Sequence, residues 1–230
     1  HGIVHQVLLE NHEKLGTQKA LQVHQHLNLV MQKTFEGQAL DIGWVEKEVF
    51  PNREQYQQMI VRKTGWYSGR GPCQCGALIA RKEGELFESL GDFGEYLGIG
   101  FQIRDDILNL TESSESNAPE AQDGGYGKEQ GGDFAEGKRT LITIEMLERL
   151  NPEEQNRLQS IMLKARTEVT EEEIVWAVEQ SERCGAIDAA RSEAQNHAQR
   201  AYSELSKMPQ GSPRKIMEEL LGFLAEDRKV

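Results

Sequence analysis

One segment in the middle of the chain limits the possible fold more than any other. It covers residues 101–110, reads FQIRDDILNL, and follows an amphipathic run at 88–97. Apolar residues recur there with helical spacing, so we expect one long helix. Residues three, four and seven positions apart share one face of a helix. The polar members of that face are Gln102, Asp105, Asp106 and Asn109.

Two adjacent carboxylates on an otherwise apolar helix are costly to bury. Like charges repel each other, and a buried carboxylate loses its hydration. A divalent cation removes this cost, and hard carboxylate oxygens favour Mg²⁺, which bridges carboxylates to substrate phosphates. A solvated acidic face is the alternative for an isolated Asp-Asp pair. The residues around Asp105 and Asp106 must therefore decide between the two interpretations.

Length and composition favour a single all-α domain over residues 1–230. The hydrophobic fraction is 37% and the charged fraction 28%, which is typical of a helical protein with a core. Alternating patterns rich in Val, Ile and Thr are nearly absent, which argues against a substantial sheet. A break is expected at 69–72, where Gly and Pro cluster. Helices are predicted at 1–16, 17–43, 53–68, 73–82, 84–110, 139–150, 152–165, 171–184, 186–207 and 213–228.

Charge and cysteine usage exclude several classes of protein. The net charge of −12 argues against a nucleic-acid partner, which requires a basic surface. A small anionic substrate is still compatible, because a bound metal sets the local sign. No apolar run is long enough for an integral membrane segment. Cys73, Cys75 and Cys184 have no framework spacing, which indicates reduced thiols and a cytoplasmic protein.

Two other polar pairs stand near helix ends. Gln38 and Asp41 are three residues apart and share a face, and Lys63-Thr64 combines a cation with a hydroxyl donor suited to diphosphate oxygens. Each pair alone is a weak signal, with exposed polar residues as the alternative. The histidines near the start of the chain are interpreted as ordinary helix residues, because no acidic general base accompanies them.

The helix at 101–110 is followed, after a polar loop, by YGKEQGGDFAEGKRT at residues 126–140. The two parts together resemble the second aspartate-rich region of the trans-isoprenyl diphosphate synthases, or polyprenyl synthetases, such as geranylgeranyl and farnesyl diphosphate synthases. In that family an FQ-x-x-DD-x-x-(D/N) helix precedes a YGK-x-x-GGD-x-x-EGK-x-(T/S) loop. The GQ-x-x-D pattern at 37–41 and the Lys-Thr pair match the family as well, so the resemblance covers most of the chain.

The resemblance implies the isoprenoid-synthase helical bundle around a central cavity, assembled as a homodimer. It implies Mg²⁺-assisted ionisation of an allylic diphosphate, followed by condensation with isopentenyl diphosphate. Asp105, Asp106 and Asn109 would then bind Mg²⁺. The expected diphosphate contacts are Gln102, Lys63, Thr64 and Lys138. Gln38 and Asp41 would line the cavity wall.

The polar loop at 111–125 lies in the sequence between the acidic helix and Lys138. Loops of this length in compact domains are commonly functional. We expect it to act as a lid that closes when metal and diphosphate bind.

One departure from the family is large. The first aspartate-rich motif, the Arg-Arg-Gly turn after it and the upstream basic residues are all absent from the 230 residues. We expect N-terminal helices to lie outside the given sequence, in which case the protein is a complete prenyltransferase. The alternatives are a divergent terpene-synthase-like lyase that acts on one prenyl diphosphate, and a catalytically incomplete partner subunit.

Overall fold

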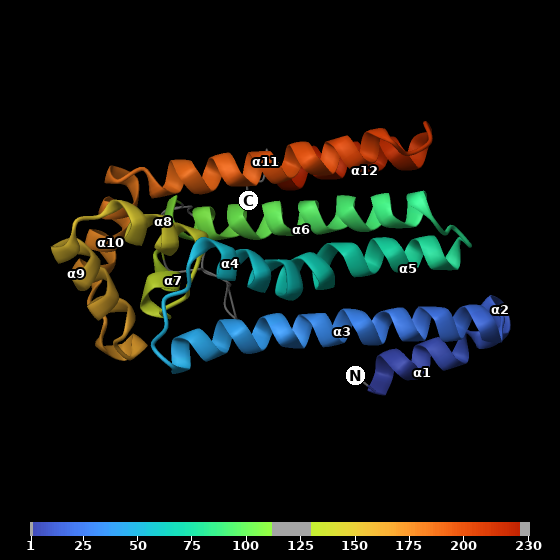
Figure 1. Cartoon of the computed structure of the whole chain (residues 1–230), viewed down its shortest axis with the longest axis horizontal. Helices are drawn as coiled ribbons and strands as arrows, with labels where there is room; N and C mark the ends of the chain where they lie inside the picture. Colours follow the sequence, from blue (N-terminus) through green and yellow to red (C-terminus); the bar gives the residue numbers. More distant parts are fainter. Residues whose placement is uncertain (1, 112–129, 226–230) are drawn as a thin grey trace, which may run out of the picture. The chain divides into compact units, whose positions relative to one another are not determined.

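The structure is a computed structural model that describes residues 2–111 and 130–225. Within these ranges it contains helices and no strand (Figure 1), which confirms the all-α prediction. The helices are α1 (Gly2–Glu10), α2 (His12–Leu15), α3 (Thr17–Glu46), α4 (Arg53–Ile60), η1 (Val61–Arg70), α5 (Gly71–Ile79), α6 (Glu85–Thr111), α7 (Gly132–Ala135), α8 (Leu141–Arg149), α9 (Pro152–Met162), η2 (Arg166–Glu168), α10 (Glu171–Arg183), α11 (Ala186–Ser206) and α12 (Ser212–Ala225).

The chain groups into two compact units. The first unit contains His1–Leu40, Gln57–Phe101 and Gln195–Val230, and the second contains Asp41–Tyr56 and Gln102–Ala194. The expectation of a single domain over the whole chain stays a prediction. No described helix has a stretch that is both long and apolar enough to cross a membrane.

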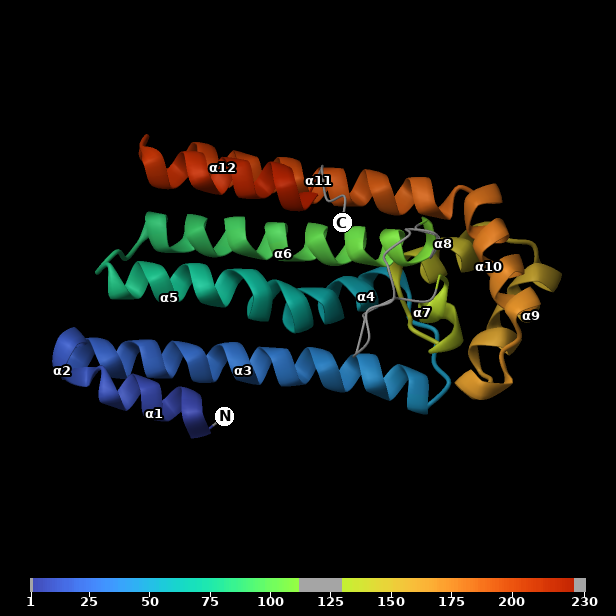
Figure 2. The same ribbon diagram turned by 180° about the vertical axis from the view of Figure 1, so that it is seen from behind.

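Long helices packed side by side make up the first unit. Figures 1 and 2 show α3, α5 and α6 next to one another, with α12 beyond α6 and α1 along the outer side of α3. Phe93 of α6 is 1% exposed and belongs to an apolar cluster of this unit. Burial of each large apolar side chain contributes about 1.5–3 kcal/mol. The other buried members of the cluster are Ala198, Ala201, Leu205, Met208 and Leu221.

Two glycines allow η1 and α6 to approach each other closely. A Cβ atom at Gly69 would overlap the backbone carbonyl of Gly94, and a Cβ at Gly94 would overlap that of Gly69. A Cβ at Gly98 would lie 3.4 Å from the carbonyl oxygen of Thr64. The backbone of η1 is therefore held directly against α6, without intervening side chains.

Short helices, α7 to α10, form most of the second unit (Figure 2). Their starts follow the capping signals in the sequence. Asn151 forms a capping box with Glu154, and Thr170 forms one with Glu173. Glu145 of α8 is 1% exposed and forms ion pairs with Arg53 and with Arg149. Loss of either arginine would weaken the compensation of this buried charge.

The predicted helix break at 69–72 is wrong. Residues 61–70 form a π-helix, and α5 begins at Gly71 without any exit from helical dihedral angles. Pro72 is the second residue of α5, and it removes one N–H donor from a helix that is otherwise continuous across this boundary. The short helix α7 is also absent from the predicted set. Apart from Thr111, which ends α6, the predicted lid at 111–125 lies outside the described residues.

Candidate functional site

The acidic face predicted from the sequence lies at the C-terminal end of α6. Asp106 is 8% exposed, and its Oδ1 accepts a hydrogen bond of 2.9 Å from Nε2 of Gln102, one turn earlier. Asn109 is 7% exposed, whereas Asp105 is only partly buried. The helix thus holds one carboxylate inside the second unit and places the other nearer to solvent.

The environment of Asp106 disfavours its charged form. Burial raises the pKa of this carboxyl to about 7, and the charges of Asp133 and Asp105 act in the same direction. The hydrogen bond from Gln102 and the charge of Lys138 oppose the shift but do not cancel it. A carboxyl group with this pKa is partly protonated near neutral pH. A cation that binds to it would displace the proton.

A tight turn after the gap in the described chain returns to α6 and places Asp133 near Asp106. The backbone N–H of Asp133 donates to Oδ1 of Asn109 at 3.2 Å, and the N–H of Gly131 donates to the Asn109 carbonyl at 2.9 Å. Gly131 has φ +74°, a conformation that favours glycine. Asn109 therefore anchors the turn, and its amide oxygen retains a second lone pair that could contact a metal.

Lys138 is bound to two carboxylates of the same turn. Its Nζ lies 2.6 Å from Oδ1 of Asp133 and 2.9 Å from Oε2 of Glu136. Burial on its own would lower the pKa of Lys138, but the hydrogen bonds to Asp133 and Glu136 raise it above its ordinary value. The side chain is still 48% exposed, so an incoming anion can reach the ammonium group.

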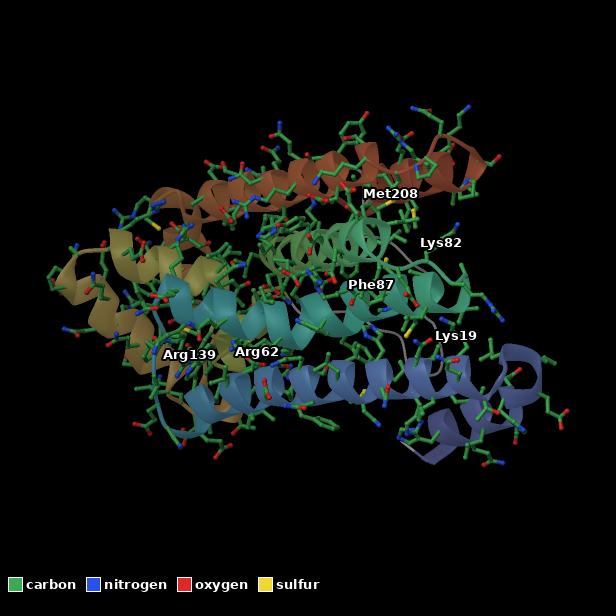
Figure 3. All side chains as sticks on the ribbon, turned by 45° about the vertical axis from the view of Figure 1, so that its right-hand side comes forward. Lys19, Arg62, Lys82, Phe87, Arg139 and Met208 are labelled. Atoms are coloured by element: carbon green, nitrogen blue, oxygen red, sulfur yellow. The ribbon has the colours of Figure 1, made fainter. Side chains whose placement is uncertain are left out.

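Arg139, which is labelled in Figure 3, belongs to the segment next to Lys138. It is 1% exposed, its Nε donates to the Val49 carbonyl at 2.9 Å, and its Nη1 donates to the Gly137 carbonyl at 2.5 Å. The guanidinium carbon lies 3.9 Å from the ring centroid of Phe50. Burial lowers the pKa of Arg139 to about 10. These contacts hold the turn against the connection between α3 and α4.

Tyr56 is a residue of this site that the sequence analysis missed. It is 2% exposed, and burial together with the charges of Asp106 and Asp41 raises the pKa of its hydroxyl well above the ordinary value. The structure thus brings the predicted residues Asp41 and Asp106 into the electrostatic environment of one phenol. Because that phenol stays protonated, its hydroxyl can donate a hydrogen bond to an anion. No local pattern around Tyr56 marks it, since its charged neighbours come from distant segments.

Of the other predicted residues, Gln38, Lys63 and Thr64 lie in the first unit, whereas Asp41, the predicted partner of Gln38, belongs to the second. Lys63 and Thr64 lie in η1, and Thr64 is 6% exposed. A Cβ atom at Gly37 would overlap the backbone nitrogen of Lys63 and lie 2.8 Å from its Cα. Gly37, which precedes Gln38, therefore lies directly against the backbone of Lys63. π-helical segments are rare and are found frequently at functional sites.

The donor set on α6 fits a magnesium ion better than a structural metal. Among the residues that the structure describes, no group of three or more His, Cys, Asp or Glu is arranged to hold a metal. Mg²⁺ binds through one or two carboxylates and completes its shell with waters and phosphate oxygens. Asp105 and Asp106 provide such a pair, and burial disfavours the charged form of Asp106 in the absence of a cation.

Curated proteins are similar to this sequence over most of its length. The chain is 31% identical over 194 residues to a short chain isoprenyl diphosphate synthase from Methanothermobacter thermautotrophicus; the match covers 84% of this chain and 55% of that protein. The chain thus spans about half the length of the curated relatives that it matches.

Solved structures share the fold. A geranylgeranyl pyrophosphate synthetase from Pyrococcus horikoshii matches with a TM-score of 0.78 and 27% identity, over 91% of this chain and 59% of that one. A geranylgeranyl pyrophosphate synthase from Corynebacterium glutamicum, complexed with isoprenyl diphosphate and magnesium, has a TM-score of 0.81. At 23% identity, and covering 93% of this chain and 57% of that one, it shows the fold alone. A family model for polyprenyl synthetases matches residues 3–180, and the chain therefore belongs to the polyprenyl synthetase family.

Proposed function

We propose that the protein is a prenyltransferase that condenses an allylic diphosphate with isopentenyl diphosphate. The observation that carries this proposal is the buried carboxyl of Asp106 next to Asp105 at the end of α6, with the turn that holds Asp133 and Lys138 beside it. Asp105 and Asp106 would bind Mg²⁺, with the amide oxygen of Asn109 as a further ligand. When bound, the ion supplies positive charge that stabilises the departing diphosphate.

The remaining polar side chains would bind and orient the diphosphate. Lys138 would exchange its contacts with Asp133 and Glu136 for diphosphate oxygens, which accept charge-assisted hydrogen bonds. Lys63, Thr64 and Gln102 would donate to the same group. These assignments follow the family motif residue by residue.

The hydrocarbon part of the substrate needs an apolar environment. Ile103, Ile107 and Leu110 of α6 are each 2% exposed or less and flank the acidic face. We infer that apolar side chains on this helix receive the prenyl tail, while Gln38 and Asp41 line the cavity wall. We also infer a homodimer and, from the three free cysteines, a cytoplasmic location.

Product analysis by mass spectrometry tests the activity. The protein is incubated with Mg²⁺ and allylic diphosphates of increasing length, with and without isopentenyl diphosphate. A longer prenyl diphosphate that forms only with the co-substrate supports the proposal. A hydrocarbon formed from the allylic diphosphate alone indicates a lyase instead. Product that appears only after a second chain is added indicates a partner subunit.

Variants separate the metal role from general effects on folding. Asp105→Ala is expected to lower turnover by several orders of magnitude while circular dichroism stays unchanged. Asp188→Ala is the matched control, because the Asp188 side chain is 79% exposed on α11 and pairs with Arg191, three residues along. Near-normal turnover of Asp105→Ala would exclude the metal role of this face.

A further inference from the structure

Two histidines from different helices of the first unit meet at short range. Nδ1 of His5, on α1, lies 3.3 Å from Nδ1 of His24, on α3, and both side chains are partly buried. Their ring centroids are 4.6 Å apart, with 49° between the ring planes. We propose that His5 and His24 form a binding site for a borderline transition-metal ion, with Zn²⁺ as its representative.

The spacing of the two nitrogens fits one shared ion. Zinc–nitrogen bonds are about 2.0–2.1 Å long, so two imidazoles at tetrahedral angles on one ion have nitrogens about 3.4 Å apart. The observed separation of 3.3 Å agrees with that value. Two neutral imidazoles at this distance can also form a hydrogen bond, in which one Nδ1 donates and the other accepts. A metal ion would instead bind the lone pairs of both nitrogens.

Other ligands are available on the same side of α3. Asn28 lies one turn after His24, and it lines an open depression of about 640 Å³ together with His5. Water molecules can complete the four-coordinate shell of an ion bound by the two imidazoles. Glu36 also lines the depression, but its carboxylate is already bound by Gln32 at 2.9 Å and by Lys33 at 3.4 Å.

The packing of α1 gives such a site a structural consequence. No described side chain of α1 is fully buried, and Val7 and Leu9 are 50% and 67% exposed. Among residues 5–10 of α1, whose side chains are described, the apolar ones therefore contribute little buried area. An ion bound by His5 and His24 would cross-link the two helices, and its binding free energy would add to the stability of that pairing.

The chemistry separates this site from the acidic face of α6. Imidazole nitrogens select Zn²⁺, Cu²⁺ or Ni²⁺, whereas Mg²⁺ prefers carboxylate and water oxygens. Millimolar Mg²⁺ can thus saturate the carboxylates without displacing an ion from the histidine pair. Zinc binding at the histidine pair is independent of the prenyltransferase activity.

Zinc titration against a chromophoric indicator, at pH 7.5 and with excess MgCl₂, tests the proposal. The wild-type protein is expected to bind one equivalent of Zn²⁺, and His5→Gln and His24→Gln are each expected to bind at least tenfold more weakly. His12→Gln is the matched control, since His12 is exposed and its Nδ1 lies 2.7 Å from the Leu9 carbonyl oxygen. Unchanged zinc affinity in both pair variants, or no binding by the wild type, would overturn the site.

A second readout covers the case in which a variant folds poorly. Zn²⁺ is expected to raise the melting temperature of the wild type and of His12→Gln, but not that of His24→Gln. With Cu²⁺, the electron paramagnetic resonance spectrum is expected to show coupling to two nitrogens in the wild type and to fewer in either pair variant. Identical spectra in all proteins would contradict the assignment.

Discussion

Nε2 of Gln102 donates a hydrogen bond of 2.9 Å to Oδ1 of Asp106, one turn further along α6. This bond stabilises the charged carboxylate, and it opposes the burial and the neighbouring carboxylates that raise its pKa to about 7. Gln102 therefore influences how readily Asp106 accepts a cation. The amide is placed for this because residues four apart share a helix face.

Magnesium affinity is accordingly expected to depend on pH. Below about pH 7 Asp106 binds a proton and loses the charge that a cation requires, so affinity should fall as the pH is lowered from 8.5 to 6. Gln102→Leu removes the donor, raises the pKa further and should weaken Mg²⁺ binding about tenfold at pH 7. The difference should shrink at high pH. Calorimetric titrations at three pH values measure both effects, and pH-independent affinity would contradict them.

The raised pKa of Asp106 also makes the stability of the fold depend on pH. The folded-state pKa of Asp106 lies above its unfolded value, so its protonated form stabilises the fold at low pH. Without metal, this contribution should be lost as the pH rises through about 7. Excess Mg²⁺ should reduce the loss, because it compensates the charge. Urea unfolding between pH 5 and 8, with and without Mg²⁺, measures the free energy of unfolding at each pH. If this free energy changed with pH by the same amount with and without Mg²⁺, the expectation would be contradicted.

Lys138→Ala tests whether the ammonium group of Lys138 binds the diphosphate. The variant should bind inorganic diphosphate, in the presence of Mg²⁺, more weakly by about 1.5–3 kcal/mol, the usual size of a charged hydrogen bond. Lys164→Ala is the control, since Lys164 also pairs with a carboxylate, Glu173, at 2.5 Å. Equal losses in the two variants would indicate a nonspecific charge effect.

Two glycines of α3 should respond in opposite ways to alanine. A Cβ at Gly37 would overlap the backbone of Lys63, so Gly37→Ala should destabilise the fold by about 1–3 kcal/mol. A Cβ at Gly43 would meet nothing within 4 Å, and Gly43→Ala should stabilise the helix by up to about 1 kcal/mol. Urea unfolding measures the free energy of unfolding of Gly37→Ala, Gly43→Ala and the wild type. Equal effects would mean that the contact between α3 and η1 tolerates a side chain.

The thiol of Cys73 should react slowly. Burial raises its pKa to about 11, which leaves few thiolates at pH 8. Alkylation by iodoacetamide at that pH should be roughly 100-fold slower than in the urea-unfolded chain, because only the thiolate reacts. Peptide mass spectrometry over time gives the rate at this residue. A rate close to that of the unfolded chain would show that the thiol is accessible.

Local signals in the sequence predicted most helices and the acidic face. The starts of α9 and α10 follow from Asn151 and Thr170, whose capping interactions involve residues only three positions away. The placement of Asp105 and Asp106 on one helix likewise needs only helical periodicity. These features were predictable because the chain segment that forms them also contains their partners.

Other features depend on contacts between distant segments. Arg139 donates to the carbonyl of Val49, 90 residues away, and Tyr56 lies near charges from α3 and α6. The π-helical register of η1 accompanies the close contacts of its backbone at Lys63 and Gly69. No local periodicity encodes such pairings. The roles of the predicted site residues likewise stay predictions until they are measured.

The π-helix also makes the segment sensitive to the number of residues in it. A π-helix bonds each residue to the fifth along the chain, one more than in an α-helix. If the π-helical bonds are kept, removal of a single residue, for example the exposed Tyr67, would turn everything downstream by the rotation of one residue. Gly69 would then no longer face Gly94. Residue count between Val61 and Arg70, more than side-chain identity, therefore sets the alignment of α5 with its neighbours.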